Sequence, residues 1–269
     1  TADEAWPERL RLLEERAGVD VQDLGSFLEA LRLRREHFKR HGATASDHGV
    51  PDTFVVSLER DEAERLFQKA LARTIDPDEA LRLASHLLFE LAGMAAQDGL
   101  VMQLHVGSFR NHHQRLFQRF GPDKGADIPV AVDWTRGLHA LLNAFGAEER
   151  FRLVLFTLDE STYGRELAPL AGHYPAVRLG APWWFFDSVL GFQRYLDAVV
   201  ETAGVYNLAG FVDDTRAFPS IPARHDVWRR SVCSWLAEKV AWGLIDEDAA
   251  PGMARWLAYE APKDAYRLG

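Results

Sequence analysis

Four polar residues follow an apolar run in the last quarter of the chain, and their types suit proton transfer or metal binding. The run is NLAGFV, residues 207–212, and Asp213, Asp214, Thr215 and Arg216 come directly after it. An apolar run bounded by turn residues is typical of a buried strand. A carboxylate beside a guanidinium stays ionised and can act as a base, but the same residue types also cap helices or form surface ion pairs. The segment therefore predicts either a catalytic strand end or a structural turn.

Polar and aromatic residues of similar kinds mark the ends of other predicted strands. They are Asp47 in the DHG segment that ends a first short strand near 43–49, His105 in the strand 100–107 with Arg110 just beyond it, and Trp183 after the strand 176–180. The carboxyl ends of parallel strands meet at one edge, so these side chains are expected to share a pocket. Three of these residues also have a simpler interpretation: His105 and Trp183 as core residues, and Arg110 as a surface residue.

Strand patterns alternate with helix patterns through most of the chain. Helical periodicity covers residues 23–40, 61–73, 77–98, 134–145, 161–172, 188–203, 225–242 and 251–259, a further strand pattern covers 151–158, and a polar loop is expected over 107–130. The alternation predicts an α/β fold with a parallel sheet and right-handed crossovers. No glycine-rich phosphate motif is present, which argues against a dinucleotide-binding fold.

Composition limits the class of protein and of partner. The chain has 269 residues, 47% of them hydrophobic, a net charge of −9 and an isoelectric point near 5.6, so a broad basic surface for nucleic acid is not expected. There is no apolar run of membrane length and no signal peptide, which predicts a cytoplasmic protein with no membrane partner. The single cysteine, Cys233, excludes an internal disulfide and is expected in the core of a helix.

Six short segments together resemble a known family. They are ASDHG (45–49), MQLHVGSFRN (102–111), FGPDKGADIP (120–129), GAPWWFFD (180–187), VDDTRAF (212–218) and RHDVWRR (224–230). Their order and spacing resemble the uronate isomerases (glucuronate isomerases), a branch of the metal-dependent amidohydrolase superfamily, from about residue 20 to the C-terminus. The resemblance implies a distorted (β/α)8 TIM barrel of the metal-dependent hydrolase type. It also implies a sugar-acid substrate, with interconversion of D-glucuronate and D-fructuronate or of D-galacturonate and D-tagaturonate.

The resemblance also implies roles for particular residues. The family's Asp-Ser-Arg motif falls on residues 214–216, which makes Asp214 the metal ligand and proton-transferring residue and Arg216 a second catalytic residue, while Asp213 is only a neighbour. The substrate-binding residues that it implies are His105, Arg110, Trp183 and Asp47. The implied cofactor is a divalent metal, with zinc as the expected ion.

The sequence departs from the family pattern in ways that affect the fold. Thr215 replaces serine, His112 and His113 replace asparagines, and the His-x-His pair that supplies two metal ligands on the family's first strand is absent. Residues 1–269 therefore resemble the C-terminal portion of one barrel domain that lacks the first strands, with helical insertions at 1–41 and 61–98. We expect association with the missing N-terminal part, or a homo-oligomer.

Two other functions remain open at this level. One is a metal-dependent hydrolase of the same superfamily, although the strand pattern 151–158 lacks the histidine ligand that such hydrolases use. The other is a catalytically inactive partial barrel that needs its N-terminal part.

Overall fold

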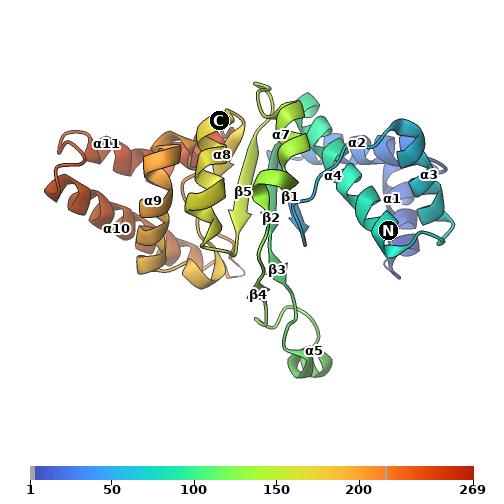
Figure 1. Cartoon of the computed structure of the whole chain (residues 1–269), viewed down its shortest axis with the longest axis horizontal. Helices are drawn as coiled ribbons and strands as arrows, with labels where there is room; N and C mark the ends of the chain where they lie inside the picture. Colours follow the sequence, from blue (N-terminus) through green and yellow to red (C-terminus); the bar gives the residue numbers. More distant parts are fainter. Residues whose placement is uncertain (1–3, 216) are drawn as a thin grey trace.

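The computed structural model describes residues 4–215 and 217–269 and shows a mixed α/β fold built on a parallel sheet (Figure 1). The strands pair in the order β1-β2-β5-β6, and each pairing is parallel. They are β1 (Ala45–Val50), β2 (Val101–Val106), β5 (Leu153–Thr157) and β6 (Val177–Leu179). The prediction of an α/β fold with a parallel sheet is therefore confirmed.

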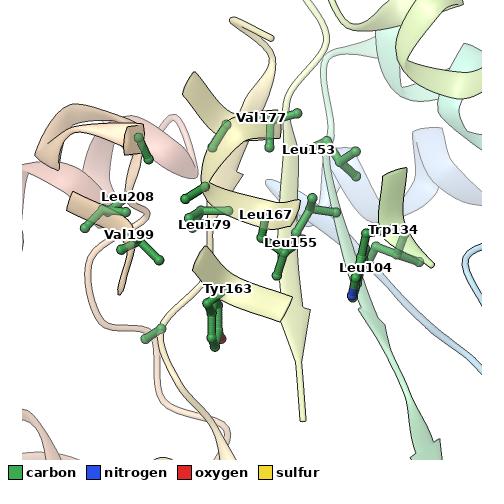
Figure 2. Close-up of a cluster of buried hydrophobic side chains, with 14 of the residues drawn as sticks. Leu104, Trp134, Leu153, Leu155, Tyr163, Leu167, Val177, Leu179, Val199 and Leu208 are labelled. Carbon is green, nitrogen blue, oxygen red and sulfur yellow. The ribbon is translucent and has the colours of Figure 1, made fainter. Parts of the chain in front are cut away.

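One face of the sheet packs against helices in the largest hydrophobic cluster. These helices include α6 (Trp134–Gly137), α7 (His139–Phe145), α8 (Ala168–His173), α9 (Val189–Ala203) and α10 (Ser220–Ala241), and α11 (Ala250–Arg255) packs against the same cluster. The last helix, α12 (Ala261–Ala265), instead contributes Ala265 to the cluster on the opposite face. Leu104, Leu155 and Leu179 belong to this cluster, together with the fully buried Trp134 and Tyr163 (Figure 2). Burial of so many apolar side chains is the main stabilising contribution to the sheet and its helices.

The opposite face of the sheet carries a smaller cluster. Because strand side chains alternate between faces, Val101, Val154 and Phe156 point away from helices α6 to α10. They pack there with Trp183, which follows β6, and with Tyr266, which follows α12. This second face leads to the functional residues described below.

The N-terminal helices form a separate hydrophobic cluster, on the right of Figure 1. They are α1 (Trp6–Ala17), α2 (Leu24–Arg40), α3 (Arg60–Leu71) and α4 (Pro77–Asp98). Capping boxes start two of them: Asp23 with Ser26 for α2, and Asp76 with Glu79 for α4, where Pro77 occupies the first turn. Strong start signals of this kind explain why the sequence located both helices to within a residue or two.

The predicted loop 107–130 has structure of its own. It projects below the sheet in Figure 1 as an arm made of β3 (Ser108–Phe109), α5 (Gln114–Phe120) and β4 (Ile128–Pro129), with β3 and β4 antiparallel. Two-residue strands carry no readable periodicity, and α5 has no buried residue, so neither leaves an apolar pattern in the sequence.

The predicted strand 207–212 is largely absent. A short 3-10 turn, η3 (Val205–Asn207), precedes a single parallel bridge between Leu208 and Leu179, and the chain then leaves the sheet. The cause is Gly210, whose φ of +67° lies outside the strand region. A Cβ at Gly210 would lie 2.4 Å from Cδ of Pro262 in α12, so the close approach of that helix requires glycine here.

Smaller differences affect the helices. The predicted helix 134–145 is divided between α6 and α7, and π turns η1 (Tyr163–Leu167) and η4 (Trp256–Glu260) interrupt two others; a further 3-10 turn is η2 (Trp184–Phe186). The prediction that Cys233 is buried is wrong, because the core side of α10 is formed by Trp228, Val232 and Trp235 and the cysteine is exposed. Among the described residues, no helix has the length and apolar character needed to cross a membrane.

A buried ion pair ties the helical cluster to the sheet. Arg35 of α2 is 7% exposed and binds Asp98 at the end of α4 through two hydrogen bonds, from Nε at 2.6 Å and from an Nη at 3.0 Å. The same guanidinium reaches Oγ of Ser46 in β1 at 3.4 Å. Two parallel N–H···O bonds fix the position of α2 relative to the α4–β2 junction.

We expect Arg35→Met to lower the free energy of unfolding by about 3 kcal/mol, because it leaves the Asp98 carboxylate unpaired. Urea unfolding followed by circular dichroism measures this loss. The matched control is Arg11→Met, which removes an exposed pair with Glu15 and should change the free energy by less than about 0.5 kcal/mol. Equal effects of the two substitutions would contradict the role given to Arg35.

Candidate active site

A cavity of about 900 Å³ opens at the carboxyl end of the sheet. The predicted residues Asp47, His105, Arg110, Trp183 and Asp214 all line it. They come from β1, β2, the arm, the segment after β6 and the segment before α10, so the fold brings together side chains up to 167 positions apart in the sequence. The other predicted catalytic residue, Arg216, lies outside the described residues.

Strand register places two of these residues in direct contact. Asp47 of β1 lies opposite Gln103 of β2, and Gly49 lies opposite His105. The diagonal pair is hydrogen-bonded, with 2.9 Å between Nε2 of His105 and Oδ2 of Asp47. A Cβ at Gly49 would lie 2.6 Å from Cε1 of His105, so the imidazole can lie over β1 only because residue 49 is glycine.

The Asp47 carboxylate is held in its ionised form. Burial raises its pKa, but hydrogen bonds from His105 and Gln103 outweigh burial and leave the pKa below its ordinary value. An ionised carboxylate only accepts hydrogen bonds, so Nε2 of His105 carries a hydrogen and donates it to Asp47. Asp47 therefore orients the imidazole of His105 through this hydrogen bond.

The neighbouring His48 points to the other side of β1. Its Nε2 lies 3.0 Å from Oγ of Ser46. Burial, and then the charge of Arg35, lower the pKa of His48 to about 4, so it is neutral near pH 7. His48 therefore belongs to the interface between the sheet and the helical cluster and not to the cavity.

Trp183 combines the core and pocket interpretations. Its side chain is 6% exposed and stacks on Phe156 with ring centroids 3.7 Å apart. Nε1 donates a hydrogen bond to the carbonyl of Val212 at 2.8 Å, which links the segment after β6 to the residues before Asp214. The exposed remainder of the indole forms part of the cavity wall.

Arg110 reaches the cavity from the arm. Its guanidinium lies 3.5 Å from Asp123 and 3.8 Å from Asp127, both of which also line the cavity. The side chain is 46% exposed, so these long ion pairs hold it weakly. A ligand carboxylate can therefore compete for this guanidinium at low cost.

The two adjacent aspartates have different surroundings. The Asp213 side chain is 3% exposed and lies 2.5 Å from Nε of Arg224 in α10, and Arg224 also contacts Asp187. Burial raises the pKa of Asp213 above its ordinary value, and the nearby His225 acts in the opposite direction. Asp214, in contrast, is exposed to the cavity.

Neither aspartate caps a helix. The residue before α10 is Pro219, and no side chain caps that helix.

Arg224, Asp187 and Gln103 are functional neighbours that the sequence analysis did not single out. All three lie in quoted motifs, RHDVWRR, GAPWWFFD and MQLHVGSFRN, and this was the available signal.

The described residues do not form a metal site by themselves. Among them there is no group of three or more His, Cys, Asp or Glu side chains placed to hold an ion. Asp214 thus does not belong to a set of three ligands within the described part of the chain.

Comparison with known proteins decides the family. A family model described as glucuronate isomerase matches residues 2–266. The chain belongs to the uronate isomerase family. It is similar to uronate isomerases of Nostoc punctiforme, at 53% identity over 98% of this chain and 56% of that protein, and of Rhizorhabdus wittichii, at 51% identity over 98% of this chain and 57% of that protein. The chain thus spans little more than half the length of these uronate isomerases.

Solved structures of the uronate isomerase family agree with this assignment. The chain matches a glucuronate isomerase from Caulobacter crescentus with a TM-score of 0.95 at 48% identity, over 99% of this chain and 56% of that one. A uronate isomerase from Thermotoga maritima gives a TM-score of 0.92 at 32% identity, over 98% and 58% of the two chains. The resemblance inferred from the six motifs is confirmed.

We expect the free energy of unfolding to fall as the pH decreases from 6.5 toward 4, in part because of His48. Its pKa is lower in the folded chain, so over this range the unfolded chain binds more protons, and acid favours unfolding. Compared with wild type, His48→Gln should lose about 2 kcal/mol less between pH 7.5 and pH 4.5.

Urea unfolding at the two pH values measures this difference. Substitution of the exposed His139 by glutamine is the control and should leave the pH dependence unchanged. Parallel profiles for wild type and His48→Gln would contradict the burial of a neutral His48.

Proposed function

We propose that this chain forms the substrate-recognition and proton-transfer portion of a uronate isomerase. The reaction is interconversion of D-glucuronate and D-fructuronate, or of D-galacturonate and D-tagaturonate. The observation that carries the proposal is the single cavity around which Asp47, His105, Arg110, Trp183 and Asp214 meet. Membership of the uronate isomerase family supports the reaction class.

We propose that the sheet is part of a (β/α)8 barrel of the metal-dependent hydrolase type, of which residues 1–269 are the C-terminal portion. The parallel order β1-β2-β5-β6, continued by the bridge of Leu208 to β6, supports an arc of such a barrel. Residues 1–41 and 61–98 are then helical insertions. Unpaired strand edges favour association, and the partner we propose is the remaining part of the barrel, with a homo-oligomer as the alternative.

Asp214 is the proposed base. Aldose–ketose isomerisation moves a proton between C2 and C1, so a carboxylate must face the substrate. The exposed carboxylate of Asp214 faces the cavity, whereas the Asp213 carboxylate is occupied by Arg224. The proposed second catalytic residue, Arg216, follows Asp214 by two positions in the sequence and lies outside the described residues.

The remaining residues are proposed to hold the substrate. Arg110 binds the sugar carboxylate through charge-assisted hydrogen bonds, and the substrate carboxylate then replaces Asp123 and Asp127 as the partner of the guanidinium. His105, oriented by Asp47, hydrogen-bonds a substrate oxygen. Trp183 supplies the apolar wall against one face of the sugar.

A divalent metal, with zinc as the proposed ion, remains part of the proposal. A catalytic zinc takes three protein ligands, and the described residues alone do not supply such a set. Asp214 is proposed as one ligand, with the others from outside this chain. When bound, the ion would polarise substrate oxygens.

We expect Asp214→Asn to lower the turnover of uronate by about a hundred- to ten-thousand-fold, the range for loss of a general base. The assay uses the chain completed with the part of the barrel that it lacks. The free energy of unfolding should change by less than about 0.5 kcal/mol because the side chain is exposed.

The matched control is Asp213→Asn, which should act mainly on stability. It weakens the contact with Arg224 and should lower the free energy of unfolding by about 2 kcal/mol, with a smaller loss of turnover. Near-normal turnover by the Asp214 variant would refute its assignment as the base.

We expect the isolated chain to bind less than one equivalent of zinc and to show no isomerisation of glucuronate. The reason is that the described residues lack a set of three ligands. Metal analysis after dialysis and a fructuronate assay test this. One tightly bound zinc with full activity in a monomer would show that the chain contains its complete ligand set.

A further inference from the structure

A chain of hydrogen bonds connects the residue after the last helix to the candidate active site. The hydroxyl of Tyr266 donates to Oε1 of Gln103 in β2. Nε2 of Gln103 donates to Oδ1 of Asp47 at 2.8 Å, and Oδ2 of Asp47 accepts from Nε2 of His105 at 2.9 Å. Tyr266 is thereby linked to His105 through two intervening side chains.

The chemistry of the four groups fixes every donor and acceptor in this chain. Ionised Asp47 only accepts, so the Gln103 amide must present its NH2 group to the carboxylate. The amide oxygen of Gln103 then faces Tyr266, whose hydroxyl is the donor. The two oxygens of Asp47 are each engaged, one by Gln103 and one by His105, so the carboxylate cannot rotate without breaking a hydrogen bond.

Tyr266 itself is rigidly held. It is 7% exposed, and it packs with Val101, Val154 and Trp183 on the cavity side of the sheet. The turn η4 and helix α12 before it approach so closely that a Cβ at Gly210 would lie 2.9 Å from the carbonyl oxygen of Leu257 in η4 and 2.4 Å from Cδ of Pro262 in α12. The C-terminal segment therefore lies against both strand β2 and the segment that leads to Asp214.

We propose that Tyr266 is a positioning residue for the candidate active site, acting through Gln103 and Asp47 to hold His105 in the tautomer that carries its hydrogen on Nε2. A neutral imidazole in this tautomer keeps Nδ1 as a hydrogen-bond acceptor. The tautomer assignment follows from the contacts of this chain, and only its value for catalysis rests on the proposed function. Gln103 is the intermediate in this chain, because within the described residues its side chain hydrogen-bonds both the Tyr266 hydroxyl and the Asp47 carboxylate.

The test is the tautomer state of His105 in the 269-residue chain, read from proton–nitrogen correlation spectra of isotope-labelled histidine. Tyr266→Phe keeps the buried ring and removes only the hydroxyl. We expect it to lower the ratio of the Nε2–H to the Nδ1–H tautomer about fivefold, the factor that corresponds to one net hydrogen bond. Tyr259→Phe is the matched control, since Tyr259 belongs to the same segment and is 58% exposed, and it should leave the ratio unchanged.

A second variant distinguishes an effect transmitted through the chain of hydrogen bonds from an effect of side-chain packing. Gln103→Met preserves the approximate shape and removes the amide, so it should lower the same ratio at least as much. The double variant Tyr266→Phe, Gln103→Met should then show the same tautomer ratio as Gln103→Met alone, because without the Gln103 amide the Tyr266 hydroxyl no longer acts on Asp47 and His105. Should the loss of the hydroxyl prevent folding, Gln103→Met carries the test alone.

Three results would overturn the proposal: an unchanged ratio in Tyr266→Phe, an unchanged ratio in Gln103→Met, or additive effects in the double variant. The spectra require no turnover. The proposed function is tested separately, by turnover of the chain completed with the rest of the barrel: if that assembly were inactive while the ratios were as expected, the proposed function would be refuted and the positioning role of Tyr266 would stand.

Discussion

The parallel register between β1 and β2 is the constraint on which the site depends. It sets Asp47 beside Gln103 and Gly49 beside His105, so that one hydrogen-bonded group forms on the cavity face of the sheet. A slip of one residue would exchange the faces and bring His48 into the cavity in place of Asp47. Contacts on the other face oppose such a slip, because Arg35 there engages the strand through Ser46. The register is thus enforced by residues that have no chemical role.

Local patterns in the sequence predicted the regular elements well. Apolar periodicity and capping residues located α2, α4 and α9, and continuous apolar runs located β2 and β5. The run 207–212 misled for a physical reason: contact with α12 imposes a left-handed conformation on Gly210, and that contact spans about fifty residues. Long-range packing of this kind leaves no mark on the local pattern.

The sequence predicted which residues form the candidate site, but not which of them contact one another. The residues at strand ends and the family motifs pointed to Asp47, His105, Arg110, Trp183 and Asp214, and all five line one cavity. The sequence did not show that Asp47 acts on His105. It also did not show that the adjacent aspartates differ in their contacts: Arg224, a helix residue ten positions after Asp214, pairs with Asp213, whereas Asp214 faces the cavity. Such pairings depend on three-dimensional contacts between elements, which residue types alone do not specify.

Helix α4 belongs to both large hydrophobic clusters, with Leu83 and Met94 in the helical cluster and Leu88 and Ala92 in the cluster of the sheet. Its last residue, Asp98, is bound by Arg35 of α2. Partial unfolding of the helical cluster would therefore remove support from the sheet as well, so the two should open as one cooperative unit and not as separate foldons. Slow amide exchange in the cavity strands would then be governed by helices that never touch a substrate.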